Sequence, residues 1–219
     1  MKLLLSSNGF SNQAIADALF ELVGKKPEDT SLVFIPTASN VDAGDKDWFI
    51  DDLINIKKQN FKSVAITDIS AVPEKIWRPQ LEEADVLFFE GGNTYHLMRW
   101  INESGLIKLL PEMLKTKVYV GLSAGSMITG PDLNLHLSRT IYGEEAEGDS
   151  MPGLGFVNFY FLPHLNNSKP HFAARIEANL KEAMKEITRK TYVLDDQSAL
   201  KVIDGKVEHV GIGKYLEFN

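Results

Sequence analysis

The sequence contains no cysteine among its 219 residues. Disulfide bridges, thiolate metal sites and a cysteine nucleophile are therefore excluded. Long apolar runs are also missing, because no stretch approaches the roughly 18 apolar residues that a membrane helix needs. The run Leu3-Leu4-Leu5 is too short for a signal peptide and is expected to be a strand. We therefore expect a cytoplasmic protein that does not contact membranes.

Basic residues are scarce relative to acidic ones. Lys and Arg number 23 against 30 Asp and Glu, which gives a formal net charge of −7. No cluster of Lys and Arg forms a stripe, so nucleic-acid binding is not expected. The chain is 44% hydrophobic and 24% charged, which is typical of globular proteins. Because no linker, repeat or low-complexity tract divides the chain, we predict one domain over residues 1–219.

Apolar runs alternate with stretches of helical periodicity through the first part of the chain. The runs are apolar along their whole length, which is typical of a parallel sheet covered by helices on both faces. We therefore predict an α/β fold with a doubly wound, mostly parallel sheet. Strands are expected at 3–5, 31–36, 63–67, 85–90 and 118–122, and helices at 11–22, 45–60, 95–101 and 107–114.

The last third of the chain predicts a change in strand direction. Strands are expected at 156–162 and 191–194, with a helix at 169–189 between them. Asp204-Gly205 separates two further apolar runs and indicates a hairpin, so the C-terminal edge of the sheet should be antiparallel. Residues 131–152 show no clear period, which favours a functional loop, although the alternation at 133–137 also fits a hairpin.

The strand at 118–122 leads into Gly121-Leu122-Ser123-Ala124-Gly125, and a helix-compatible stretch follows. Gly-x-Ser-x-Gly between a strand and a helix is the pattern of a nucleophile elbow, which exposes the serine at the carboxyl edge of the sheet. Glycines on both sides admit the strained turn. Ser123 is therefore the candidate nucleophile. The pattern is short, and an ordinary strand–helix turn containing serine would look the same.

A serine nucleophile needs a base, an acid that orients the base, and amides that bind the oxyanion. Ligands of open α/β sheets bind beyond the carboxyl ends of the strands. His164 follows a strand and a proline there and is the candidate base. Asp149, in the irregular loop, and Asp196, at the end of another strand, are alternative acids.

A second glycine signal follows the strand at 85–90. Glycine lets a backbone amide approach a ligand closely, so the amides of Gly91-Gly92 and Ala124 are candidates for an oxyanion hole. A tight strand–helix turn would explain the same glycines. Asn93 either belongs to this site or caps the next helix.

Three segments of the chain together resemble a known family. The segments are Phe89-Glu90-Gly91-Gly92-Asn93-Thr94, the Gly121–Gly125 elbow and Pro163-His164. In this order they resemble peptidase family S51, the aspartyl dipeptidase (peptidase E) family. That family is related to cyanophycinases. The resemblance covers nearly the whole chain. It implies a flavodoxin-like, class I glutamine amidotransferase-like fold in which serine replaces the amidotransferase cysteine.

The resemblance also implies roles for individual residues. Asp149 looks like the counterpart of the family's acid, which lies between the elbow and the histidine, and Asp196 looks like a second acidic position. The residues that match the family's nucleophile, base and two oxyanion amides are Ser123, His164, Gly92 and Ala124.

Substrate preference depends on the segment after the histidine. Aspartyl dipeptidases carry an arginine there that binds the β-carboxylate of the substrate. The segment is shorter in this chain, Arg175 is its arginine, and the register places Phe172 at the specificity position. A charged substrate group needs a bidentate partner, so Arg175 is a candidate substrate-binding residue together with Asn93.

The resemblance implies a serine-type dipeptidase or exopeptidase that hydrolyses short peptides, with N-terminal aspartyl dipeptides as one candidate substrate. It implies no metal or cofactor, and a monomer or small homo-oligomer is expected. Two alternatives remain. One is an α/β-hydrolase-type esterase with Ser123, Asp196 and His209, although little chain follows the elbow for that fold. The other is a non-catalytic module that binds a peptide or small molecule.

Overall fold

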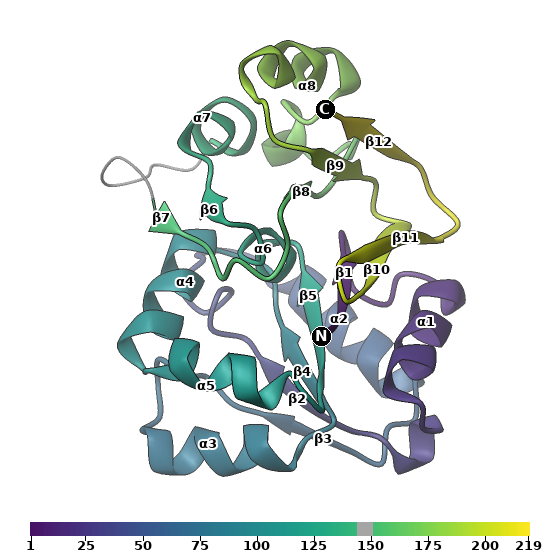
Figure 1. Ribbon diagram of the computed structural model, residues 1–219, viewed down its shortest axis with the longest axis vertical. Helices are drawn as coiled ribbons and strands as arrows, with labels where there is room; N and C mark the ends of the chain where they lie inside the picture. Colours follow the sequence, from purple (N-terminus) through teal and green to yellow (C-terminus); the bar gives the residue numbers. More distant parts are fainter. Residues whose placement is uncertain (144–150) are drawn as a thin grey trace.

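The computed structural model describes residues 1–143 and 151–219. A seven-stranded sheet with the order β11-β10-β1-β5-β4-β2-β3 forms its centre (Figure 1). Five neighbouring strands pair in parallel, which confirms the predicted mostly parallel sheet. These are β1 (Lys2–Ser6), β2 (Ser31–Ile35), β3 (Ser63–Ile66), β4 (Val86–Phe89) and β5 (Val118–Leu122).

The C-terminal hairpin is also confirmed. Strands β10 (Ser198–Ile203) and β11 (Lys206–Gly211) pair antiparallel, and β10 pairs antiparallel with β1. Asp204 and Gly205 form the turn with φ of 49° and 82°. Two consecutive positive φ values suit the twist of a two-residue hairpin, which explains the Asp-Gly sequence.

Helices cover both faces of the central sheet. Alternate side chains of a strand point to opposite faces, so a strand buried on both sides is apolar throughout. Leu4, Phe34 and Val120 pack on the face covered by α1 (Gln13–Val23) and α2 (Asp47–Lys58). Leu5, Phe89 and Tyr119 pack on the other face, under three helices (Figure 1). These are α3 (Glu74–Glu83), α4 (Thr94–Glu103) and α5 (Leu106–Met113).

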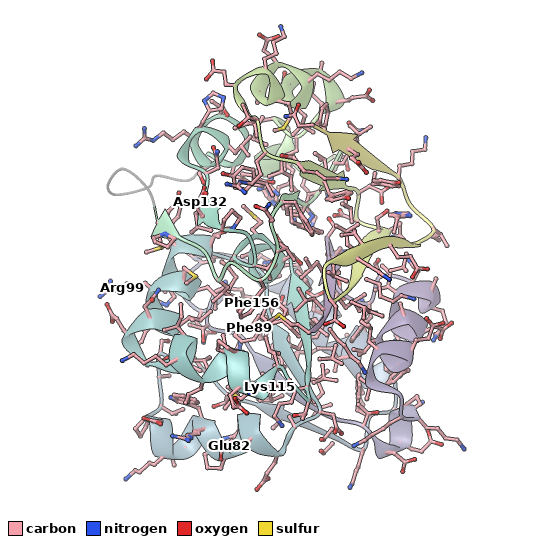
Figure 2. All side chains as sticks on the ribbon, viewed as in Figure 1. Glu82, Phe89, Arg99, Lys115, Asp132 and Phe156 are labelled. Carbon is pink, nitrogen blue, oxygen red and sulfur yellow. The ribbon has the colours of Figure 1, made fainter. Side chains whose placement is uncertain are left out.

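A cluster of three aromatic rings packs against the turn that follows β5. Phe89 stacks on Tyr119 at 4.7 Å between ring centroids, and Phe156 meets Tyr119 edge-on at 5.9 Å. In the view of Figure 2, Phe89 and Phe156 lie near the middle of the molecule, whereas Arg99 lies at its edge. The Tyr119 hydroxyl donates to the carbonyl of Gly125 at 2.6 Å. The cluster therefore anchors α6 (Ala124–Met127) to the strand that precedes it.

A smaller three-stranded sheet lies beside the central one, in the upper part of Figure 1. Its order is β12-β9-β8, with β8 (Tyr160–Leu162) and β9 (Thr191–Leu194) parallel and β12 (Tyr215–Phe218) antiparallel to β9. Leu162, Leu180 and Val193 belong to a separate small core under this sheet. The strand before His164 is therefore part of an accessory sheet, and it is shorter than the predicted 156–162.

The single helix predicted at 169–189 is wrong. The segment forms a 3₁₀ turn at Pro170–Phe172, the helix α8 at Glu177–Ala183 and another 3₁₀ turn at Met184–Glu186. The break occurs because the carbonyl of Arg175 accepts the N–H of Asn166 at 2.8 Å, and Ile176 is extended. This break turns Arg175 towards the cavity described below.

Two more elements escaped prediction. Helix α3 has a polar sequence with Pro79 inside it and buries mainly Trp77 and Leu81. Strand β12 was not expected at all. In the irregular region, β6 (Asp132–Leu133) pairs antiparallel with β7 (Met151–Pro152), while α7 (Leu135–Leu137) and a π-helix at Ser138–Tyr142 replace the alternative hairpin at 133–137. Within the described ranges, every helix is too short or too polar to span a bilayer.

Candidate active site

Ser123 occupies the turn between β5 and α6 in a strained conformation, with φ of 48° and ψ of −106°. A positive φ is uncommon for a residue other than glycine and persists only where the surroundings enforce it. The backbone N–H of Ser123 donates to the carbonyl of Ser6 at 3.0 Å. A Cβ on Gly125 would lie 2.2 Å from the carbonyl oxygen of Phe89, so only glycine allows this close approach. The local geometry is that of the predicted elbow.

His164 lies two residues after β8, with its side chain against the elbow. Its Nε2 is 3.1 Å from Oγ of Ser123, and its ring stacks on Phe172 at 4.2 Å. Burial lowers the pKa of His164 below its ordinary value, although the neighbouring Asp196 opposes that shift. The imidazole is therefore neutral at neutral pH and can accept a proton from Ser123.

Asp196 follows β9 and contacts the other ring nitrogen of His164. Its Oδ1 lies 2.5 Å from Nδ1 of His164 and accepts the hydroxyl of Ser7 at 3.0 Å, while its Oδ2 accepts the side-chain amide of Asn167. Burial raises the pKa of Asp196, but the hydrogen bonds from His164, Asn167 and Ser7 outweigh it and hold the pKa below its ordinary value. The parallel pairing of β8 and β9 brings the two strand ends together.

The structure distinguishes among the predicted partners of the serine. Asp149 lies outside the described residues. His209 is not brought to Ser123: its Nε2 is 3.0 Å from Oγ of Ser198, and its ring stacks on Tyr215. Asp196 contacts His164 instead of His209. The triad of Ser123, His209 and Asp196 that the esterase alternative requires is therefore not formed.

Gly91 and Gly92, which we call the glycine loop, lie against the elbow. A Cβ on Gly91 would be 3.3 Å from Cβ of Ser123, and a Cβ on Gly92 would be 2.4 Å from the carbonyl oxygen of Ala38. Gly92 also has φ of +125°, which side-chain-bearing residues rarely adopt. Across residues 1–143 and 151–219, neither the Gly92 nor the Ala124 N–H donates to another protein group. Both amides are therefore available for an external acceptor.

Asn93 has a structural role at the start of α4. Its Oδ1 accepts the N–H of His96 at 2.8 Å and caps α4, and its own N–H donates to the carbonyl of Ala38 at 2.9 Å. Its side chain does not line the cavity beside Ser123. The structure thus supports the capping interpretation of Asn93.

A cavity of about 610 Å³ opens beside Ser123 and His164. Arg175 lines it and is only 7% exposed, with its guanidinium between the rings of Tyr142 and Phe172 at 4.2 and 4.1 Å. Side chains of both charges line this cavity, so it suits a ligand that carries both. The carboxylates are Asp42, Asp45, Asp47, Asp52 and Asp196, and the basic side chains are Lys169, His171 and Arg175 in addition to His164.

Three residues of this site were not identified from the sequence. Ser7 follows β1 at the same edge of the sheet as Ser123, so the strand-end argument could have found it. Asp52 shares the inward face of α2 with Ile56, where an apolar side chain would be expected. Glu90 follows a wholly apolar strand and is completely buried. A charged residue at a core position was the available signal in the last two cases.

Comparisons with known proteins place the chain among peptidases. The sequence model of peptidase family S51 matches residues 3–210. An uncharacterized peptidase of Pasteurella multocida is 26% identical over 168 residues, which cover 76% of this chain and 79% of the relative. Peptidase E of Streptomyces coelicolor is 28% identical over 210 residues, which cover 92% and 81%.

The fold has a solved counterpart. The crystal structure of a candidate peptidase E of Listeria monocytogenes superposes with a TM-score of 0.76 at 22% identity, covering 97% of this chain and 98% of that one. At this identity the superposition shows the fold alone, whereas the family match extends over nearly the whole sequence. The chain therefore belongs to peptidase family S51.

Proposed function

We propose that this protein is a serine peptidase that hydrolyses short peptides with Ser123, His164 and Asp196 as its catalytic triad. One observation carries the proposal: Oγ of Ser123, both ring nitrogens of His164 and the Asp196 carboxylate form a continuous hydrogen-bonded chain at a strained elbow. Nucleophile, base and orienting acid in that order define serine-dependent acyl transfer, whatever their order in the sequence.

The acylation step follows from these contacts. Oγ of Ser123 forms a bond to the scissile carbonyl carbon while its proton passes to Nε2 of His164. Asp196 holds the imidazole in the required orientation and stabilises its charged form. The carbonyl oxygen becomes negatively charged in the tetrahedral intermediate, and the N–H groups of Gly92 and Ala124 are the proposed donors to it.

The intermediate then collapses. The carbon–nitrogen bond breaks, and the imidazolium of His164 gives its proton to the departing amine. A water molecule attacks the acyl-enzyme, His164 takes one of its protons, and the second tetrahedral intermediate releases the carboxylic acid product. The proton on His164 returns to Oγ of Ser123, so the protein ends unchanged.

Arg175 supports a preference for an acidic N-terminal residue. Its guanidinium stacks on Phe172, whose opposite neighbour is the ring of His164, so a positive charge lies one aromatic ring away from the base. Guanidinium groups bind carboxylates bidentately. We propose that Arg175 binds the side-chain carboxylate of an N-terminal Asp, which makes aspartyl dipeptides the proposed substrates.

A dipeptide panel tests this function. The wild-type protein and Ser123→Ala are assayed on Asp-Leu, Glu-Leu, Asn-Leu and Ala-Leu. We expect serine-dependent cleavage that is fastest for Asp-Leu. Cleavage of the neutral dipeptides at the same rate would refute the role of Arg175 and keep the mechanism, whereas a folded wild-type protein that cleaves none of them would refute the function.

A further inference from the structure

A pair of buried carboxyl groups lies next to the glycine loop. Glu90, the residue before Gly91, is fully buried, and Asp52 on α2 is 6% exposed. In the described part of the chain, no side-chain N–H group or hydroxyl donates to either oxygen of Glu90, and the backbone N–H of Gly91 acts on this carboxyl. The Asp52 carboxyl is the hydrogen-bond partner of the Glu90 carboxyl. The triad mechanism uses neither residue.

These two carboxyl groups share one proton. Two carboxyls can hydrogen-bond only if a proton lies between them, because two carboxylates repel each other. Burial raises the pKa of Glu90 well above its ordinary value and raises the pKa of Asp52 to about 6. Because Glu90 is fully enclosed and Asp52 lines the cavity beside Ser123, the negative charge of the pair is less costly on Asp52.

Asp52 is the member of the pair that lines the cavity beside Ser123. A Cβ on Gly9 would lie 3.5 Å from Oδ1 of Asp52 and 2.8 Å from the side chain of Leu122, the residue that precedes the nucleophile. The charge of Asp52 therefore lies in the wall next to the elbow. Among the described residues, no Lys or Arg forms an ion pair with it, and Lys169 acts only at longer range.

A buried carboxylate without a cationic partner is costly, and a cation supplied by a ligand would offset that cost. The other carboxylates of the cavity differ in this respect. Asp45 and Asp47 are exposed and Asp42 is half-buried, so water already solvates them, while Asp196 is hydrogen-bonded to His164, Ser7 and Asn167. Asp52 thus offers the strongest site for a cationic group of the substrate.

The substrate carries such a cation at the required place. In a peptide cleaved after its first residue, the α-ammonium nitrogen is separated from the scissile carbonyl carbon by one atom, a distance of roughly 2.5 Å. When Ser123 attacks that carbonyl, the ammonium group must therefore lie in the cavity that opens beside Ser123. Asp52 lines this cavity.

We propose that Asp52 binds the α-ammonium group of the substrate and thereby directs cleavage to the N-terminal peptide bond. Glu90 acts as a positioning residue, because its O–H donates to one oxygen of Asp52 and leaves the other for the ammonium. This inference rests on the proposed function and adds to it the group that recognises a free amino terminus.

The test compares each substrate with its analogue that lacks only the amino group. For Asp-Leu that analogue is succinyl-leucine, which keeps both carboxylates and the scissile bond. The ratio of kcat/KM for the two compounds is measured for the wild type, Asp52→Asn and Asp52→Ala. The control is Asp51→Asn, which removes an exposed carboxylate from the same helix. Thermal melting confirms that each variant folds.

We expect the wild type and Asp51→Asn to favour the amino-bearing compound by roughly 100-fold, the usual worth of a hydrogen-bonded charge pair. In both Asp52 variants that ratio should fall to within about threefold of unity. A ratio that stays at the wild-type value in the Asp52 variants overturns the inference, as does an equal loss of activity on both compounds, which would indicate a structural role.

A binding measurement separates this inference from the proposed function. If the folded wild type cleaves neither compound, the proposed function fails, and calorimetric titration of Ser123→Ala decides the inference. Asp-Leu should bind at least tenfold more tightly than succinyl-leucine to Ser123→Ala, and Ser123→Ala/Asp52→Asn should lose the difference. Equal affinity for the two compounds in Ser123→Ala, or no binding of either, refutes the role of Asp52.

Discussion

The hydroxyl oxygen of Ser7 accepts the backbone N–H of His164 at 2.8 Å. The same hydroxyl donates to Oδ1 of Asp196 at 3.0 Å, so one side chain at the end of β1 fixes both the base and the acid. His164 needs this support because it has a positive φ of 66°. The accessory sheet is thereby tied to the edge of the central sheet at the catalytic residues.

Removing that hydroxyl should slow catalysis without weakening substrate binding. We expect Ser7→Ala to lower kcat roughly tenfold, the worth of one lost hydrogen bond to a charged group, with KM nearly unchanged. Steady-state kinetics on Asp-Leu measure both constants. The matched control is Ser31→Ala, which removes a serine–aspartate hydrogen bond of 3.0 Å to Asp85 far from the site. A change in KM alone would contradict the positioning role.

The dependence of kcat on pH should report the titration of His164. Its pKa lies below the ordinary value because it is buried. As the pH falls through that pKa, the imidazole gains a proton and can no longer accept one from Ser123. We therefore expect kcat to fall on the acid side with a midpoint below about pH 6.5. A profile measured from about pH 4.5 to pH 8 checks this, and a midpoint above pH 7 would be inconsistent with a buried imidazole.

Asp196→Asn extends the same experiment. The Asp196 carboxylate stabilises the charged imidazole and raises the pKa of His164 against the effect of burial. Its removal should move the acid midpoint to still lower pH as well as reduce the plateau. A midpoint that moves upward would show that Asp196 does not act on the imidazole.

The glycine loop should tolerate no side chain at Gly92. A Cβ there would meet the carbonyl oxygen of Ala38 at 2.4 Å, and backbone cannot move aside as a flexible side chain can. We expect Gly92→Ala to lower the free energy of unfolding by at least about 3 kcal/mol. Gly44→Ala is the control, because Gly44 has φ of +95° but a Cβ added there would have no atom within 4 Å. Gly44→Ala should lower the free energy of unfolding by only about 1 kcal/mol. Chemical denaturation measures both, and equal losses would show that strain in φ alone is responsible.

The sequence predicts the architecture well where local pattern and burial coincide. Strands β1, β2, β4 and β5 are mainly apolar because both of their faces are covered, whereas the edge strand β3 is largely exposed. The elbow is visible because the close contact of Gly125 with the Phe89 backbone requires glycine. It fails where tertiary contacts override local preference. Residues 169–189 have helical periodicity, but the hydrogen bond from Asn166 to the Arg175 carbonyl and the extended backbone of Ile176 separate the 3₁₀ turn at Pro170–Phe172 from α8.

The candidate site could be predicted only in part for a related reason. Ser123, His164 and the glycine loop follow strands, so their common edge can be inferred from the order of strands. The choice of acid depends on which strand lies beside β8, and the pairing of β8 with β9 that delivers Asp196 leaves no trace in local sequence. Asp52 and Glu90 meet only in the folded chain, since one lies on a helix and the other follows a strand 38 positions later.

The central claim is that Ser123, His164 and Asp196 act as one unit, and a double variant tests it most directly. We would measure kcat/KM on Asp-Leu for Ser123→Ala, Asp196→Asn and the variant that carries both changes. Each single change should lower kcat/KM by roughly 10³-fold or more, and the double variant should be no slower than the worse single variant. An Asp196→Asn protein with wild-type activity, or losses that multiply in the double variant, would contradict the account.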